Sequence, residues 1–334
     1  MIFEDQLFGW QIISDFDLGE LGASCADERS HGELRVCRAE SDGWKQREGP
    51  ILLEERDENG QLWLASWKYG DGYVAHFPGI CSFLILPDAM RIEFLPEAGI
   101  GKAATAHMIL DHAIPRLLAL KPGYVVLHAS AIALEGSVVA LLGVSGQGKS
   151  TLAAWLASQG HPALTDDCLV LRWDEEEKEW LAQPSYESVR LWPDSADALQ
   201  IDKAGMKPFA EYSPKMRTGK EAQLCFATEG APLRGCFVLG GKEGNKETHK
   251  GAPVVRALPV NEAFVALIGS VFRVDAENAQ INRREFEAMT GLTDRVRFWS
   301  LSYERKYDWL PEVQAAMIRA LQSGREENQK GYTY

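Results

Sequence analysis

The sequence predicts an α/β protein in which a smaller, strand-rich N-terminal region precedes a larger domain. Residues 1–100 carry aromatic and β-branched residues between turn signals, whereas residues 123–322 mix apolar strand-like runs with helical spacing. The 334 residues, 46% of them hydrophobic, are enough for one large and one small core. We expect a helix within 101–122 to connect the two parts and a disordered tail over 323–334.

Turn signals mark two hairpins in the N-terminal region. GDG interrupts QLWLASWKYGDGYVAHFPG, and PDA divides SFLILPDAMRIEFLP. From Thr105 to Leu120 the apolar residues recur near helical spacing despite Pro115, which predicts a helix with a kink. Lys121-Pro122-Gly123 ends this helix.

The larger domain begins with two predicted apolar strands in YVVLHASAIALEGSVVALLGV, joined by a tight turn at EGS. Further strands are predicted at Cys168 to Trp173 and Cys236 to Gly240, with a late helix around Trp309 to Leu321. We interpret RWDEEEKEWL as a solvated charged hairpin and LGGKEGNKETHKG as a flexible loop.

Composition and charge argue against several classes of protein. The net charge of −13 speaks against a nucleic-acid partner, because binding a polyanion requires a basic face. The apolar runs are far shorter than the roughly 20 residues that span a bilayer, and MIFEDQLFGW does not resemble a signal peptide. We therefore expect a cytoplasmic protein with no membrane partner. The six cysteines include no C-x-x-C pair, which favours reduced thiols over a zinc site or disulfides.

Residues 143–150, GVSGQGKS, match the Walker A phosphate loop (P-loop) pattern G-x-x-x-x-G-K-[ST]. The strand-like SVVALLGV leads into it and the helix-like TLAAWLASQG leads out, which is the context the motif requires. Its glycines free the backbone to approach phosphates closely, and N–H groups at the helix start point toward them. Lys149 would bridge the β- and γ-phosphates of ATP, and the Ser150 hydroxyl would ligate Mg²⁺. The predicted nucleotide contacts are Gly143, Ser145, Gly146, Gln147, Gly148, Lys149, Ser150 and Thr151.

A kinase also needs acidic groups for the metal and for the proton of a hydroxyl nucleophile. Asp166 and Asp167 in HPALTDDCLVL are the candidates; they begin an apolar strand, whereas the usual Walker B aspartate ends one. His128 is one titratable residue in an otherwise apolar strand. Such a histidine is more often a satisfied core residue than a functional one.

LHASAI, GVSGQGKST and TDDCLVL, at these spacings, resemble the HPr kinase/phosphorylase family, whose catalytic domain is related to phosphoenolpyruvate carboxykinase. The resemblance covers roughly Tyr124 to Val170. It implies a P-loop kinase domain of that type with a mixed sheet and flanking helices. It also implies that Asp166 accepts the serine proton, Asp167 helps to hold Mg²⁺ and His128 lies near the transferred phosphoryl group.

The sequence departs from that family downstream. The family segment E-[IV]-R-G-[LI]-G is absent, and SYESVRLWPDSADAL stands in its place, with Glu187 and Arg190 as loose counterparts of its acid and arginine. The run Arg190-Leu191-Trp192-Pro193 resembles HPr-kinase-like proteins of peptide-modification clusters, including kinases of a lasso-peptide C-terminus. This implies that HPr is a poor substrate and that the acceptor is a serine or threonine of a peptide or protein.

Arginine and lysine side chains are candidates for contacts to phosphate or to a substrate carboxylate, because a guanidinium offers planar paired donors. We single out Arg190, which the resemblance supports as a catalytic residue. The others of this kind are Lys215, Arg217, Arg234 and Arg273.

Alternative functions share the same loop. A regulatory module would bind ATP and signal by conformation, but it has no use for a base beside the γ-phosphate, so Asp166 discriminates between the two. A small-molecule kinase would be expected to carry an arginine-rich lid, and residues 240–251 contain lysines but no arginine. An ABC-type ATPase is disfavoured because L-S-G-G-Q is missing. Assembly into a homo-oligomer stays an open expectation.

Overall fold

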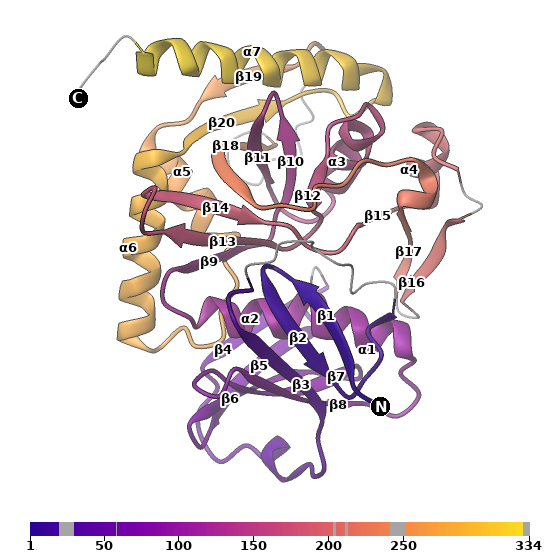
Figure 1. Cartoon of the computed structure of the whole chain (residues 1–334), viewed down its shortest axis with the longest axis vertical. Coiled ribbons are helices and arrows are strands. Elements are labelled where there is room, and N and C mark those ends of the chain that lie inside the picture. Colours follow the sequence, from indigo (N-terminus) through magenta and orange to yellow (C-terminus); the bar gives the residue numbers. More distant parts are fainter. Residues whose placement is uncertain (20–29, 58, 203–204, 211–212, 241–250, 330–334) are drawn as a thin grey trace.

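The computed structural model describes residues 1–19, 30–57, 59–202, 205–210, 213–240 and 251–329. Over these residues the chain is a mixed α/β protein with an N-terminal sheet, a larger central sheet and a small third sheet. Helical segments between residues 102 and 119 lie between the N-terminal and central sheets (Figure 1). No helix in the described ranges is long and apolar enough to cross a bilayer.

The N-terminal sheet has the strand order β1-β2-β3-β8-β7-β6-β5-β4 among the described residues. Both predicted hairpins are present: Gly70 and Asp71 join β5 to β6, and residues 87–90 join β7 to β8. Gly70 has a φ of 54°, a left-handed conformation that glycine adopts without steric cost. The strands are β1 (Phe3–Leu7), β2 (Trp10–Ser14), β3 (Glu33–Arg38), β4 (Leu53–Arg56), β5 (Leu62–Tyr69), β6 (Gly72–Phe77), β7 (Cys81–Leu86) and β8 (Arg91–Pro96).

The predicted connecting helix is present in three pieces, α1 (Lys102–Met108), a π-turn η3 (Ile109–Ala113) and α2 (Ile114–Ala119). The irregularity lies just before Pro115, which has no N–H to donate to the turn before it. The Ile114 N–H instead donates to the Ile109 carbonyl, five residues back. The wider turn places Asp111 on the buried side of the helix, where it is 4% exposed.

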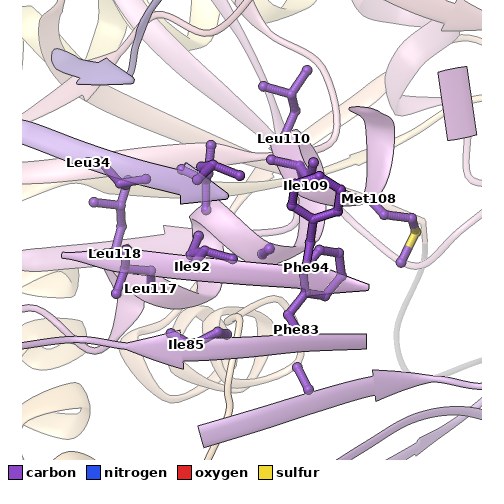
Figure 2. Close-up of a cluster of buried hydrophobic side chains, with 14 of the residues drawn as sticks. Leu34, Phe83, Ile85, Ile92, Phe94, Met108, Ile109, Leu110, Leu117 and Leu118 are labelled. Atoms are coloured by element: carbon purple, nitrogen blue, oxygen red, sulfur yellow. The ribbon is translucent and has the colours of Figure 1, made fainter. Parts of the chain in front are cut away.

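One apolar core joins the N-terminal sheet to this helix and to the central sheet. Figure 2 shows Ile109, Leu117 and Leu118 of the helix beside Ile92 and Phe94 of the sheet. The same cluster continues into Val126, Val170 and Tyr186 of the larger region. The predicted division into 1–100, 101–122 and 123–322 stays a prediction, and its first two segments share their packing with the third.

The unfolding free energy should fall as the pH is lowered from about 7.5 to about 5.5. Burial lowers the pKa of His107 and His112 on the connecting helix. In the unfolded chain each gains a proton near pH 6.5, whereas the folded chain keeps both neutral to lower pH. Stability that is present above pH 6.5 is therefore lost below it, by up to about 1.4 kcal/mol per pH unit for each histidine.

Urea unfolding at three pH values across this window measures the effect. The variant His112→Gln should show a shallower decline than the wild type, because one of the two protonation sites is gone. A free energy of unfolding that does not change between pH 7.5 and 5.5 would contradict the burial of neutral histidines.

The central sheet has the path β12-β10-β11-β18-β14-β13-β9 among the described residues, and β20 pairs with both β18 and β19. β11 runs parallel to β18 and antiparallel to β10, and all its residues are buried. Its bounds and those of its neighbours are β9 (Tyr124–Leu127), β10 (Ser130–Leu134), β11 (Ser137–Leu142), β12 (Ala163–Thr165), β13 (Leu169–Asp174), β14 (Glu179–Gln183), β18 (Ala231–Leu239), β19 (Val254–Ala257) and β20 (Arg297–Ser302).

Alternating residues of β11 supply two cores. Val139 and Leu141 pack with α3 (Lys149–Ser158) and α7 (Leu310–Gln329), whereas Val138, Ala140 and Leu142 pack with α5 (Val260–Ile268) and α6 (Ala279–Arg295). Helices therefore cover both faces of the sheet, which suits a strand without exposed residues. The third sheet, β15 (Ser188–Leu191), β16 (Lys207–Ala210) and β17 (Ser213–Gly219), lies with α4 (Pro193–Ala198) at the α3 side (Figure 1).

Two predictions need correction here. The apolar run before the turn at Glu135 and Gly136 is two strands, because β9 pairs with β13 while β10 pairs with β11 and β12. The chain changes partner at His128 and Ala129, between β9 and β10.

The second correction concerns the expected disordered tail over 323–334: α7 continues through Gln329, and residues 330–334 lie outside the described residues.

The charged segment RWDEEEKEWL is a hairpin of β13 and β14, as predicted. The predicted loop at 241–250 lies outside the described residues. The five cysteines within the described ranges form no disulfide.

Candidate active site

The predicted phosphate loop connects the end of β11 to the start of α3. Gly146 and Gly148 have φ values of 77° and 86°, so a side chain at either position would strain the backbone. Gly148 is the N-cap of α3 and provides no side-chain acceptor, and the first bond it receives comes from Leu152 N–H. The N–H groups of the first helical turn therefore form a donor set of the kind that binds an anion such as a phosphate.

Lys149 lies under the loop rather than in solvent. It is 5% exposed, and its Nζ donates to the carbonyls of Gly143 at 2.7 Å and Val144 at 3.3 Å. Burial lowers its pKa, while the carboxylates of Asp167 and Asp166 act in the opposite direction. The ammonium group is thus within the electrostatic reach of both aspartates and of the loop.

One side chain of the loop and one from a distant segment hold its backbone in place. Gln147 Oε1 accepts from Val144 N–H at 3.1 Å, and a Cβ on Gly143 or Gly240 would overlap the Gln147 amide. Arg305, just beyond β20, donates from Nη1 to the Gly146 carbonyl at 2.7 Å. The glycine at 240 was not predicted to matter, and its role follows from the path of β18 beside β11.

Asp166 and Asp167 lie in the short connection between β12 and β13. They follow one strand as well as preceding another, which corrects the expectation that they only begin a strand. Thr165 Oγ1 donates to the Cys168 carbonyl at 2.6 Å and closes the connection. Asp167 has a φ of 73°, a conformation that aspartate tolerates better than most residues.

Asp166 is enclosed by the protein. It is 1% exposed, its Oδ1 accepts from Ser130 Oγ at 2.8 Å and its Oδ2 accepts from Arg190 N–H at 3.0 Å. Burial raises its pKa, and the charge of Asp167 adds to the increase. A raised pKa suits a base, but both oxygens are already used within the fold. The assignment of Asp166 as the base stays a prediction, and in this structure its two oxygens are held by Ser130 and by the Arg190 backbone.

Asp167 is the more accessible of the pair, with a side chain that is 20% exposed. Its Oδ2 pairs with Arg190 Nη2 at 2.8 Å. Burial alone would raise its pKa, but Arg190, His128, Lys215 and Lys149 together hold it below its usual value. Asp167 is therefore an anion surrounded by cations and close enough to Lys149 to affect its pKa.

Arg190, on β15, lies in the interior of the protein. It is 4% exposed, and its guanidinium reaches Asp167, Asp111 and the carbonyl of Asp166. Burial alone would lower its pKa, but Asp111 and Asp167 raise it well above the usual value. A direct contact of Arg190 with a substrate carboxylate or phosphoryl group stays a prediction, and in this structure the carboxylates of Asp111 and Asp167 pair with its guanidinium.

His128 lies beside the aspartates, at the break between β9 and β10. Its backbone N–H donates to the Ser270 carbonyl at 2.6 Å, which fixes the break. Burial lowers the pKa of its imidazole, partly offset by the charge of Asp167. The ring is therefore neutral near pH 7 and half-buried. His128 lies within electrostatic reach of Asp167 and Lys149, and its role as a site residue stays a prediction.

The other cationic candidates separate into two groups. Arg234 pairs with Glu179 and Arg273 pairs with Glu285, both away from the loop. Lys215, on β17, lies close enough to Asp167 and Lys149 to affect the pKa of each. The sequence around Lys215 has no distinguishing pattern, so only the folded structure shows that it lies near Asp167 and Lys149.

Sequence reasoning did not single out several residues of the site. Ser130 lies inside the LHASAI segment, two residues after His128, so its pattern could have indicated a role. Asp111 and Tyr186 are 75 residues apart in sequence and contact each other in the interior. No local sequence pattern predicts this contact. Arg305 reaches Gly146 across 159 residues of sequence.

The predicted metal ligands are Ser150 and Asp167. Within the described ranges, no group of three or more His, Cys, Asp or Glu side chains could hold a metal ion by itself. Magnesium is commonly held by one or two protein groups together with water and substrate phosphates. A hydroxyl at the loop and a permanently ionised carboxylate near Lys149 fit that kind of shared site.

Comparisons with known proteins add little to this geometry. No protein-family model and no curated protein matches this chain. Among solved structures, the Hpr(Ser) kinase/phosphatase from Coxiella burnetii is a match, with a TM-score of 0.33 and 10% identity. The match covers 63% of this chain and 99% of that one. The functional argument below therefore rests on the residues of this chain.

Proposed function

We propose that this chain is an ATP-dependent phosphotransferase that moves the γ-phosphoryl group of ATP to a serine or threonine hydroxyl of a peptide or protein. One observation carries the proposal. Lys149 is the first residue of α3 and follows a glycine-rich turn. Its ammonium group lies within electrostatic reach of the ionised carboxylate of Asp167 and of the neutral imidazole of His128. The groups proposed to bind phosphate and the groups proposed to hold the metal and accept the proton therefore lie together.

The loop residues hold the nucleotide in this proposal. The N–H groups around Gly148 and the Lys149 ammonium bind the β- and γ-phosphates, and the lysine leaves the carbonyls of Gly143 and Val144 to do so. Ser150 and Asp167 hold Mg²⁺, which when bound would neutralise charge on the phosphate oxygens. Gln147 and Arg305 keep the loop in shape.

In the transfer, the acceptor oxygen forms a bond to the γ-phosphorus as the bond from that phosphorus to the β-phosphate oxygen breaks. The hydroxyl proton must leave the acceptor oxygen. Because Asp166 is enclosed, we propose that this proton passes to the carboxylate of Asp167, with His128 within electrostatic reach of it. Asp166 supports the loop by holding Ser130 and the Arg190 backbone.

The finer assignment is a P-loop kinase domain of the HPr kinase and phosphoenolpyruvate carboxykinase type. It is supported by the motif resemblance over residues 124–170 and by the meeting of its three motif segments around Lys149. A peptide acceptor, which includes a ribosomally made peptide, is favoured over HPr by the missing E-[IV]-R-G segment. Recognition of a substrate carboxylate by Arg190 is no longer part of the proposal, because that side chain is internal.

The test is transfer of label from Mg²⁺ and γ-radiolabelled ATP to HPr, to a peptide ending in serine and to its C-terminal amide. Label should appear on both peptides at rates within about threefold of each other and more slowly on HPr, and EDTA should abolish it. Binding of a non-hydrolysable ATP analogue is measured by calorimetry in parallel.

Each result separates the alternatives. Nucleotide binding without transfer to any hydroxyl would favour the regulatory module over the kinase. Faster labelling of HPr than of either peptide would contradict the acceptor class. A strong preference for the acid over the amide would show a carboxylate-recognising cation other than Arg190, with Lys215 the nearest candidate. No binding of the analogue would overturn the nucleotide site itself.

A further inference from the structure

A buried polar cluster connects the candidate site to the helix between the two large sheets. Its centre is Asp111, in the π-turn η3, at 4% exposure. The Tyr186 hydroxyl donates to this carboxylate, at 2.8 Å from Oδ1 and 2.7 Å from Oδ2. His107, one turn earlier, lies with Nδ1 at 2.6 Å from Asp111 Oδ2. All three residues lie outside the predicted phosphate loop, residues 143–150.

Arg190 links this cluster to the site. Its Nη2 lies 3.6 Å from Asp111 Oδ1 and 2.8 Å from Asp167 Oδ2. One guanidinium group is therefore shared between a carboxylate of the connecting helix and the carboxylate at the transfer point. Its backbone N–H also donates to Asp166 Oδ2 at 3.0 Å, which ties β15 to the aspartate pair.

The charges explain why the arrangement is constrained. A buried carboxylate is costly unless it is paired and hydrogen-bonded, and Asp111 has the tyrosine, the histidine and the arginine as partners. A guanidinium is planar, so an anchor on one side fixes the direction of its other donors. Without the charge of Asp111, Arg190 would be free to rotate toward the aspartate pair alone.

We infer that Asp111 is a positioning residue of the proposed transfer site: it fixes the Arg190 guanidinium, which in turn sets the position of the Asp167 carboxylate. This inference rests on the proposed function. It assigns the connecting helix a part in the chemistry and gives a reason for the irregular turn before Pro115, since π-turns often occur at functional positions.

The test compares Asp111→Asn with Asp275→Asn. Asparagine keeps the size of Asp111 and removes its charge. Asp275 is equally buried, at 4%, but it accepts only from the N–H groups of Glu277 and Asn278, so it is a matched control for losing a buried carboxylate. Supporting residues of this kind typically contribute about 10-fold to 100-fold in activity or metal affinity. We expect a kcat loss in that range for Asp111→Asn, with KM for ATP within about threefold, and a wild-type kcat for Asp275→Asn.

A second measurement does not depend on transfer. Binding of Mn²⁺ in the presence of ADP, followed by electron paramagnetic resonance, should weaken about 10-fold in Asp111→Asn and stay unchanged in Asp275→Asn, because a displaced Asp167 is a poorer ligand. Melting temperatures of all three proteins show that each is folded at the assay temperature.

Several outcomes would overturn the inference. One is a kcat and a Mn²⁺ affinity in Asp111→Asn that equal those of the wild type. Another is an equal loss of kcat and Mn²⁺ affinity in Asp111→Asn and Asp275→Asn, which would indicate that Asp111 has only a structural role. If Asp111→Asn does not fold, Asp111→Glu is tested instead. The longer side chain keeps the charge but shifts the carboxylate, so kcat should fall by a similar factor. A wild-type kcat in Asp111→Glu would overturn the inference. If the wild type transfers no phosphoryl group, the proposed function fails while the Mn²⁺ titration still tests Asp111. If the wild type binds neither ADP nor Mn²⁺, both fail.

Discussion

Replacing Lys149 with alanine should abolish phosphoryl transfer and weaken ATP binding by about 10-fold to 100-fold. The variant loses the cation expected to pair with the β- and γ-phosphates, and a hydrogen bond to a charged group contributes about 1.5 to 3 kcal/mol. The N–H groups at the start of α3 remain, so binding should weaken rather than vanish. Transfer should suffer more than binding, because charge on the phosphoryl oxygens develops as the reaction proceeds.

Calorimetry with a non-hydrolysable ATP analogue and the radiolabel assay measure the two effects. Lys102→Ala, at the exposed start of α1, is the control for removing a lysine and should behave as wild type. The melting temperature without nucleotide should change little in Lys149→Ala, because the two hydrogen bonds that Nζ donates go to carbonyls of its own loop. Transfer within about twofold of wild type in the folded variant would remove the phosphate-loop assignment.

The two aspartates should respond differently to substitution by asparagine. Asp167→Asn should lower the transfer rate by about 10² to 10⁴, because the amide can neither accept a proton nor hold a metal as the carboxylate does. ATP binding without metal should be retained. Asp166→Asn should instead lower stability by about 1 to 3 kcal/mol, because the amide cannot accept from both Ser130 and the Arg190 backbone. Its transfer rate should fall less than that of Asp167→Asn.

Transfer rates, urea unfolding and the Mg²⁺ concentration needed for half-maximal rate separate these expectations. Asp167→Asn should also lower stability, because it removes one of the carboxylates that pair with the buried Arg190 guanidinium, so the transfer rate and the Mg²⁺ requirement separate the two variants. If Asp166→Asn stays stable and loses transfer while Asp167→Asn remains active, the base assignment made from sequence is right and the one made from burial is wrong.

Parts of the site could be predicted because their cause is local. The loop from Gly143 to Ser150 needs a strand, three glycines and a helix start in direct succession, and each leaves a pattern in the sequence. The same holds for the hairpin turns at Gly70 and at Glu135 with Gly136, where the backbone conformation decides which residues are allowed. The kink expected near Pro115 likewise followed from a missing N–H.

The separate roles of Asp166 and Asp167 could not be predicted in this way. They are adjacent and chemically identical, and only their partners in the folded structure distinguish them: Ser130 and the Arg190 N–H for Asp166, and the Arg190 guanidinium for Asp167. The partners that enclose Asp166 come from β10 and β15, which lie 36 and 24 residues away in sequence. The burial of Arg190 could not be predicted for the same reason: an arginine is normally exposed, and its burial depends on Asp111 and Asp167 both reaching it.

The sequence by itself determined the mixed α/β class, the hairpins, the connecting helix and the strand, glycine-rich turn and helix over residues 137–158, because hydrophobic periodicity and turn chemistry act between residues a few positions apart. The tertiary structure alone decided that the apolar run around His128 divides between two sets of partner strands, that α7 continues beyond residue 323, and that Asp111, Tyr186 and Arg190 meet behind Asp167. These features depend on which distant segments pack together, and the cost of burying each charge is offset only by partners that the fold brings from elsewhere in the chain.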